Sequence, residues 1–283
     1  MNNNNQRGLN DIAGPESWYT SLPFVTKHWL TAVLITTVSC NLEVLPIMKL
    51  VWSFESIKND FEIWRIVTPF LWIGGFGKEE GFQTIISLFL LYQYSSQYER
   101  GGGFNTGGGG GTADYVYMLL FGMVMILITN ALFVGGYVMA KTLAYYVLYI
   151  WSKHNPTANA NIWGVPVPAI YLPFAILALN FCLGNNYMEY IHGYAVGHLY
   201  YFVADVVPKV YGKTYLETPL FILSKFGVGE YVPPAPRNGM DATGNNVRRQ
   251  GGIAAPGRVN PPNDPASRST GHSWGNGGQR LGR

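Results

Sequence analysis

The sequence has little charge and almost no cysteine. Only 12% of its 283 residues are Asp, Glu, Lys or Arg, whereas soluble globular domains carry about 25%. Its two cysteines, Cys40 and Cys182, both lie in apolar runs, which argues against a disulfide-stabilised secreted scaffold. The formal net charge of +3 is too small to predict nucleic-acid binding.

The N-terminal residues also lack the pattern of a cleavable signal peptide. The first 28 residues are polar and rich in Asn, with no charged start followed by an apolar core. We therefore expect the first apolar run to act as an uncleaved signal anchor.

Aromatic residues and charge-poor stretches are abundant instead. Aromatic side chains make up 15% of the chain. The middle of the chain contains six charge-poor, apolar stretches, and several of them are shorter than the ~20 residues that cross a ~30 Å hydrocarbon core. Short spans of this kind would thin the bilayer locally. Six such apolar stretches in series nevertheless predict an all-α membrane protein. The predicted helices cover 29–49, 81–98, 115–133, 137–151, 168–184 and 190–206.

The distribution of basic residues predicts the orientation. From Lys209 onward the chain holds ten Lys or Arg against four Asp or Glu, and the loop at 51–80 holds three against five. The positive-inside rule then places the tail in the cytosol and, with six helices, the N-terminus there too. The predicted parts are a cytosolic N-terminal segment 1–28, a six-helix domain 29–206, a juxtamembrane segment 207–231 and a disordered cytosolic tail 232–283.

The lumenal loop contains Glu62, Trp64 and Arg65 close together. One interpretation is an interfacial Trp beside an Arg that extends to the membrane surface. The other is a polar pin, in which Arg65 donates to backbone carbonyls and fixes a half-buried loop. The next apolar stretch, 66–77, is too short to span and contains Pro and Gly, so we expect it to be partly embedded.

Gly193 and Gly197 are four residues apart and share one face of the sixth helix, which lets another helix approach closely. His198 follows them and is either a functional residue or a hydrogen-bonded packing residue. His192 lies six residues before His198 on a different face, and no Asp or Glu cluster joins it. We therefore predict no metal and no cofactor.

The tail ends in a glycine-rich, basic segment in which one aromatic and one aliphatic residue are seven positions apart. This spacing suits a short peptide that inserts two side chains into a partner, although low-complexity sequence explains it equally well. The predicted partner-binding residues are Trp274, Gly275, Gly277, Arg280, Leu281 and Gly282.

These features together resemble the Derlin family, rhomboid-like pseudoproteases of the endoplasmic reticulum. The resemblance covers most of residues 15–230. The residues that carry it are Trp64-Arg65, Phe89-Leu-Leu-Tyr-Gln-Tyr-Ser95, Ala113-Asp-Tyr115, Met118-Leu-Leu-Phe121, Val147-Leu-Tyr149, Tyr171-Leu-Pro173, Gly193-x-x-x-Gly197-His-Leu-Tyr-Tyr-Phe202 and the ending Trp274-Gly-x-Gly-x-x-x-Leu-Gly282.

The resemblance implies a rhomboid-like six-helix bundle without protease activity. Active rhomboids carry a serine in a Gly-x-Ser-Gly element that opens the fourth helix, and a histidine on the sixth. The corresponding stretch here, 135–140, has no serine, and the histidine position falls at Tyr190. A Ser–His dyad needs both partners.

The resemblance also implies a role in endoplasmic-reticulum-associated degradation, as a multi-pass protein of that membrane with both termini in the cytosol. The implied partners are a hexameric AAA unfoldase bound by the tail, a membrane-embedded ubiquitin ligase complex, misfolded proteins and lipid. Homo-oligomerisation stays open. We further expect polar side chains to line a cavity open to lipid, namely Gln93, Ser95, Asn130 and Asn180.

Two alternatives remain. One is an active intramembrane protease with an atypical nucleophile, for which Ser87, Ser95 and Thr129 are the candidates. The other is a channel or transporter, which inverted repeats with matching broken helices would favour.

Overall fold

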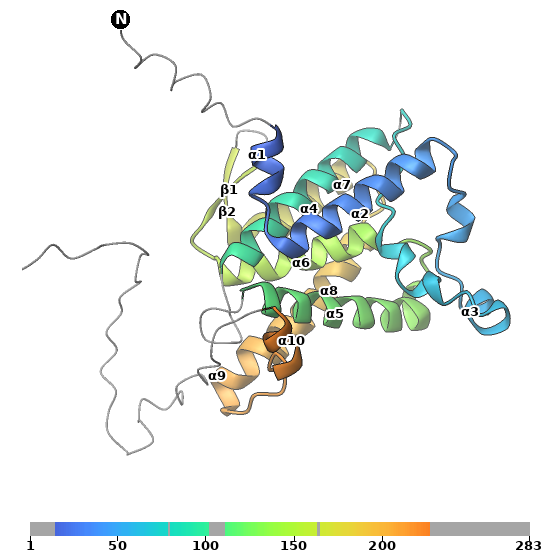
Figure 1. The fold of residues 1–283 in the computed structure, drawn as a ribbon. Helices are drawn as coiled ribbons and strands as arrows, with labels where there is room; N and C mark the ends of the chain where they lie inside the picture. The colour runs from blue at the N-terminus through green and yellow to red at the C-terminus, as the bar shows by residue number, and fades with distance from the viewer. Residues whose placement is uncertain (1–14, 79, 102–110, 163–164, 227–283) are drawn as a thin grey trace, which may run out of the picture. The chain divides into compact units, whose positions relative to one another are not determined.

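The computed structural model describes residues 15–78, 80–101, 111–162 and 165–226, which belong to one compact unit and are mostly helical (Figure 1). The elements follow in the order α1 (Pro15–Thr20), α2 (Phe24–Asn41), η2 (Ile47–Lys49), α3 (Phe54–Asp60), η3 (Ile63–Ile66), η4 (Thr68–Phe70), α4 (Gly81–Gly101), α5 (Gly111–Thr129), η5 (Asn130–Val134), α6 (Ala140–His154), β1 (Asn159–Ile162), β2 (Val165–Pro168), η6 (Ala169–Tyr171), α7 (Leu172–Cys182), α8 (Met188–Tyr201), η7 (Phe202–Val206), α9 (Val207–Tyr211) and α10 (Leu220–Lys225).

A helix occupies each of the six predicted ranges. They are α2, α4, α5 with its π-helical extension η5, α6, α7, and α8 with its π-helical extension η7. The turn expected at 135–136 is present, because Gly135 ends η5 with a positive φ of 68°. Glycine adopts this conformation at little cost.

The limits of α2 differ most from the prediction. It begins at Phe24 rather than 29 and ends at Asn41 rather than 49. The carboxylate of Glu99 accepts from the backbone N–H groups of Val25 (3.0 Å) and Thr26 (2.8 Å). An anion at a helix N-terminus is favourable, so a residue more than 70 positions away determines where α2 begins. At the other end the chain turns at Glu43, whose φ is +60°.

Other ordered segments lie outside the predicted helices. Part of the segment 1–28 is helical, since it contains α1 and the first residues of α2. The juxtamembrane segment contains α9 and α10. Strands β1 and β2 form an antiparallel hairpin that pairs Asn159 with Pro168. Pro166 and Pro168 lie in β2, and the residue before a proline disfavours helical backbone, so the fifth predicted helix begins later, with α7 at Leu172.

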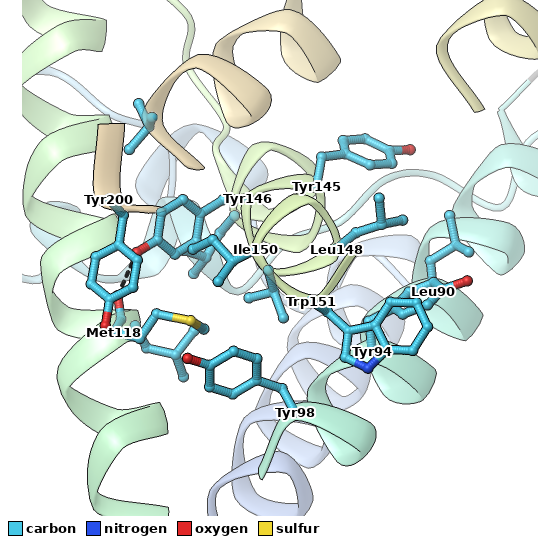
Figure 2. Close-up of a cluster of buried hydrophobic side chains, with 14 of the residues drawn as sticks. Leu90, Tyr94, Tyr98, Met118, Tyr145, Tyr146, Leu148, Ile150, Trp151 and Tyr200 are labelled. Carbon is cyan, nitrogen blue, oxygen red and sulfur yellow. Dashed lines mark hydrogen bonds between the residues drawn. The ribbon is translucent and has the colours of Figure 1, made fainter. Parts of the chain in front are cut away.

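The core of the molecule lies around α6. Twelve of its fifteen residues are buried, and it packs against α4, α5, α7 and α8. Figure 2 shows its side chains reaching neighbouring helices: the Tyr146 hydroxyl donates to the carbonyl of Met118 on α5 (2.8 Å), and the Trp151 ring lies 4.8 Å from that of Tyr94 on α4. A buried tyrosine hydroxyl usually finds such a partner.

Length and composition single out one candidate membrane span among the described residues. The helical stretch Gly111–Val134 has 24 residues and a mean hydropathy of 2.2, and Ala169–Cys182 is a shorter apolar helix. Six membrane crossings therefore stay a prediction.

The short elements that connect or flank the main helices lie at two opposite ends of the bundle. In Figure 1, α3 lies at the end opposite to α1, the β1–β2 hairpin, α9 and α10. This separation follows from the alternating direction of the helices. It gathers the segments predicted to be lumenal at one end and those predicted to be cytosolic at the other.

Candidate functional site

The loop between α2 and α4 is held by Arg65. Its side chain is buried, and Nη1 donates to the carbonyls of Met48 (2.7 Å) and Val51 (2.8 Å). The guanidinium also forms an ion pair with the carboxylate of Glu62. The hydroxyl of Thr68 adds a bond to the Leu50 carbonyl (2.8 Å). This is the geometry of the polar pin considered from the sequence, with the Arg65 side chain turned into the loop.

Trp64 bonds to the same short stretch of the loop as Arg65. It is half-exposed, and its Nε1 donates to the carbonyl of Lys49 (3.2 Å). Its neighbours Ile63 and Val67 are also exposed. Trp is enriched where membrane meets water, so this part of the loop has the character expected of an interfacial segment.

The chain beyond the pin packs into the bundle. Pro69 and Phe70 are buried, and Ile73 contacts Val33 of α2 and Ala140 of α6 in a small apolar cluster. Gly74 lies so close to Thr84 that an added Cβ would be 2.3 Å from its Oγ1. The stretch predicted to be partly embedded is thus fixed against protein along much of its length.

The glycine pair brings α8 against α6. A Cβ on Gly193 would lie 2.5 Å from the carbonyl oxygen of Thr142, and one on Gly197 would lie 3.1 Å from the Tyr149 ring. At Gly193 only glycine permits this separation, whereas at Gly197 a Cβ would require the Tyr149 ring to shift slightly. Close approach of two helices at the pair, which the spacing predicts, is what the structure shows.

His198 contacts α6 at the same interface. Its Nδ1 lies 2.9 Å from the hydroxyl of Tyr149, and the two rings are nearly perpendicular. The side chain is otherwise exposed. Its contacts are those of the hydrogen-bonded packing residue considered from the sequence.

A phenol occupies the position where the resemblance expects a catalytic histidine. Tyr190 is fully buried, stacks on Tyr145 with ring centroids 4.1 Å apart, and accepts a hydrogen bond from Gln83 Nε2 (2.7 Å). A phenol in this environment acts as a packing and hydrogen-bonding group. The described residues hold no cluster of three or more potential metal ligands.

A cavity of about 420 Å³ lies at the end of the bundle predicted to face the lumen. Charged side chains line it from three separate segments: Glu80 before α4, Lys141 on α6 and Glu189 on α8. His192 lies on its wall, with Nε2 held 2.7 Å from the Thr129 hydroxyl. This cavity cannot be predicted from a local pattern, because its lining residues share no linear motif.

The four polar residues predicted to line a cavity open to lipid lie in different places. Of the four residues expected to line a cavity, Asn130 does so, whereas Gln93, Ser95 and Asn180 are not among the lining residues. Asn180 donates to the carbonyl of Ile176 four positions earlier. Asn130 also holds the next loop, because its side chain exchanges two hydrogen bonds with the backbone of Gly136.

The predicted partner-binding peptide, from Trp274 to Gly282, lies outside the described residues.

Comparison with known proteins gives a consistent answer. The profile of the Der1-like family matches residues 22–220. The chain is 32% identical to Derlin-2.1 of Zea mays over 236 residues, which cover 79% of this chain and 90% of that protein. It is also 32% identical to Derlin-1 of Arabidopsis thaliana over 251 residues, which cover 87% and 86% of the two chains.

Proposed function

Because the chain belongs to the Der1-like family, we propose that it takes part in endoplasmic-reticulum-associated degradation. In this role it helps misfolded lumenal and membrane proteins move toward the cytosol. The observation that carries the proposal is the family match over residues 22–220, which includes the Arg65 pin and the glycine pair. The apolar helix Gly111–Val134 adds support for a membrane protein.

The proposed location is the endoplasmic reticulum membrane, with six crossings and both termini in the cytosol. The excess of Lys and Arg from Lys209 onward supports this orientation. So does the separation of α3 from α1, α9 and α10 in Figure 1.

The proposed mechanism begins with short helices. The eleven residues of α7 would extend about 17 Å at ~1.5 Å per residue, well below a ~30 Å hydrocarbon core. Because α7 exposes much of its surface, the bilayer beside it would have to thin. A polypeptide crossing a thinner layer leaves fewer backbone groups unsatisfied, and each such group costs several kcal/mol.

The loop and the tail complete the proposal. Arg65 keeps the lumenal loop in one conformation, and Trp64 anchors it at the membrane surface. The terminal peptide around Trp274 and Leu281 recruits a hexameric AAA unfoldase, while a membrane-embedded ubiquitin ligase complex modifies the client. Homo-oligomerisation is compatible with this scheme.

No catalytic step is proposed. The stretch 135–140 lacks serine, and Tyr190 stands at the expected histidine position. Thr129, a candidate atypical nucleophile, lies next to His192, but its hydroxyl donates to the carbonyl of Met125 (2.7 Å). A hydroxyl whose proton goes to the backbone accepts from the imidazole and is not activated by it. Ser87 and Ser95 are fully buried.

The tail assignment is tested by pull-down of the purified unfoldase with the detergent-solubilised chain. Truncation after Ser273 should abolish binding, and Leu281→Ala should weaken it about tenfold, because one of two apolar anchors is lost. Arg268→Ala, outside the peptide, is the matched control and should bind normally. Full binding by the truncated chain would overturn this part of the proposal.

A further inference from the structure

The cavity at the predicted lumenal end contains polar groups that have no partner within the protein. Among the described residues, the carboxylate of Glu189 and the ammonium of Lys141 make no hydrogen bond or ion pair. Trp72 also lines the cavity, and its Nε1 is buried without a hydrogen-bond partner. Glu189 and Lys141 are partly exposed and line the cavity, so their charged groups are available to a ligand that enters it.

His192 adds an acceptor to the same wall. Its side chain is 9% exposed, and the Thr129 hydroxyl, which donates to Met125, accepts from Nε2. The proton is therefore on Nε2, and Nδ1 carries a lone pair. Because the ring lines the cavity, this lone pair is available to a donor that enters it.

The charges favour a cation. The cavity has two carboxylates, Glu80 and Glu189, against one ammonium, Lys141. With His192 neutral, the sum is one negative charge. The aromatic rings of Trp72 and Tyr137 also line it, and aromatic faces attract cations. The ammonium of Lys141 suits a carbonyl oxygen.

We propose that this cavity binds a basic residue of a polypeptide, with its guanidinium or ammonium group at Glu189, Glu80 and His192 Nδ1 and its main-chain carbonyl at Lys141. A volume of about 420 Å³ is within the range of small-ligand sites. The polypeptide as the source of the cation rests on the proposed function, whereas the cation site itself does not.

The test uses the full chain in lipid nanodiscs and two labelled peptides, acetyl-Ala-Ala-Arg-Ala-Ala-amide and the same peptide with citrulline. Citrulline has nearly the shape of arginine without its charge. Fluorescence anisotropy should show the arginine peptide binding at least about tenfold tighter, the factor expected when charge-assisted hydrogen bonds are lost. Glu189→Gln should remove this preference, and Glu55→Gln on exposed α3 should keep it.

A second variant covers the case in which Glu189→Gln fails to fold. Lys141→Gln removes the competing cation and should increase the preference for arginine over citrulline. Equal binding of the two peptides by the native chain, or a preference that survives Glu189→Gln, would overturn the site. Agmatine supplies the guanidinium without a main chain. If it competes as well as the arginine peptide, the polypeptide is not the source.

Failure of this site and failure of the proposed function give different results. The chain truncated after Ser273 should keep its preference for the arginine peptide while losing the unfoldase. Loss of both on truncation would contradict the assignment of the cavity to the described helices.

Discussion

Helices α6 and α7 follow each other in the chain, but the more polar of the two, α6, is buried and the more apolar, α7, is exposed. α6 contains three tyrosines, two lysines and a histidine, yet twelve of its fifteen residues are buried. α7 is almost entirely apolar, yet only four of its eleven residues are buried, and Phe174 and Phe181 are exposed. In a water-soluble protein the more apolar helix would be the enclosed one. The reversed order is the one expected of a helix that faces lipid, as the proposed membrane location requires of α7.

The comparison also separates two ways of holding a helix. α6 is fixed by backbone contact at Gly193 and by tyrosine hydrogen bonds such as that of Tyr146. α7 packs mainly through a few side chains, among them Leu172 and Ile176. Lipid tails are as apolar as the side chains of α7, so no strong hydrophobic force drives that helix inward.

The largest effect is expected at the contact of α6 with α8. Gly193→Leu would force side-chain atoms against the Thr142 carbonyl, which a Cβ alone would approach to 2.5 Å. Because the backbone cannot move aside, we expect the free energy of unfolding to fall by at least about 3 kcal/mol. Equilibrium unfolding in detergent micelles measures this change. The control is Ala195→Leu at an exposed position of the same helix, and equal losses in both variants would contradict a close contact at the glycine pair.

A smaller effect distinguishes the two faces of α7. Ile176 is 4% exposed and Phe174 is 62% exposed. Ile176→Ala leaves a cavity and should cost about 2 kcal/mol, whereas Phe174→Ala should change stability by less than about 0.5 kcal/mol. The same unfolding assay compares them. A larger loss for Phe174→Ala would mean that this face is covered by protein.

Local patterns in the sequence predict much of the helical scaffold. A helix lies in each of the six charge-poor ranges. The spacing of Gly193 and Gly197 predicts the face of α8 that contacts another helix, which is α6. The start of α2 was missed because Glu99, which caps it, is distant in sequence. The end of α2 was missed because an apolar stretch up to residue 50 says nothing of the turn at Glu43.

The candidate site was predictable only in part. Trp64 and Arg65 are adjacent, so their importance can be inferred, but the carbonyls that Arg65 binds belong to Met48 and Val51. The cavity was missed because Glu80, Lys141 and Glu189 come together only when three helices meet. Polar residues inside the helices, such as Asn180, are easier to recognise in the sequence. Asn180, however, donates to the carbonyl of Ile176 in its own helix.

The central claim is that a pinned lumenal loop serves the turnover of misfolded proteins, and client half-life tests it most directly. The chain should be the sole member of its family in the cell and should carry Trp64→Ala with Arg65→Ala, at the native expression level. Losing the bonds to Met48 and Val51 frees the loop, at about 1.5–3 kcal/mol for hydrogen bonds of a charged group. The account predicts a client half-life at least about twofold longer, with Lys58→Ala in the same loop as the unaffected control. An unchanged half-life in the double variant would contradict the account.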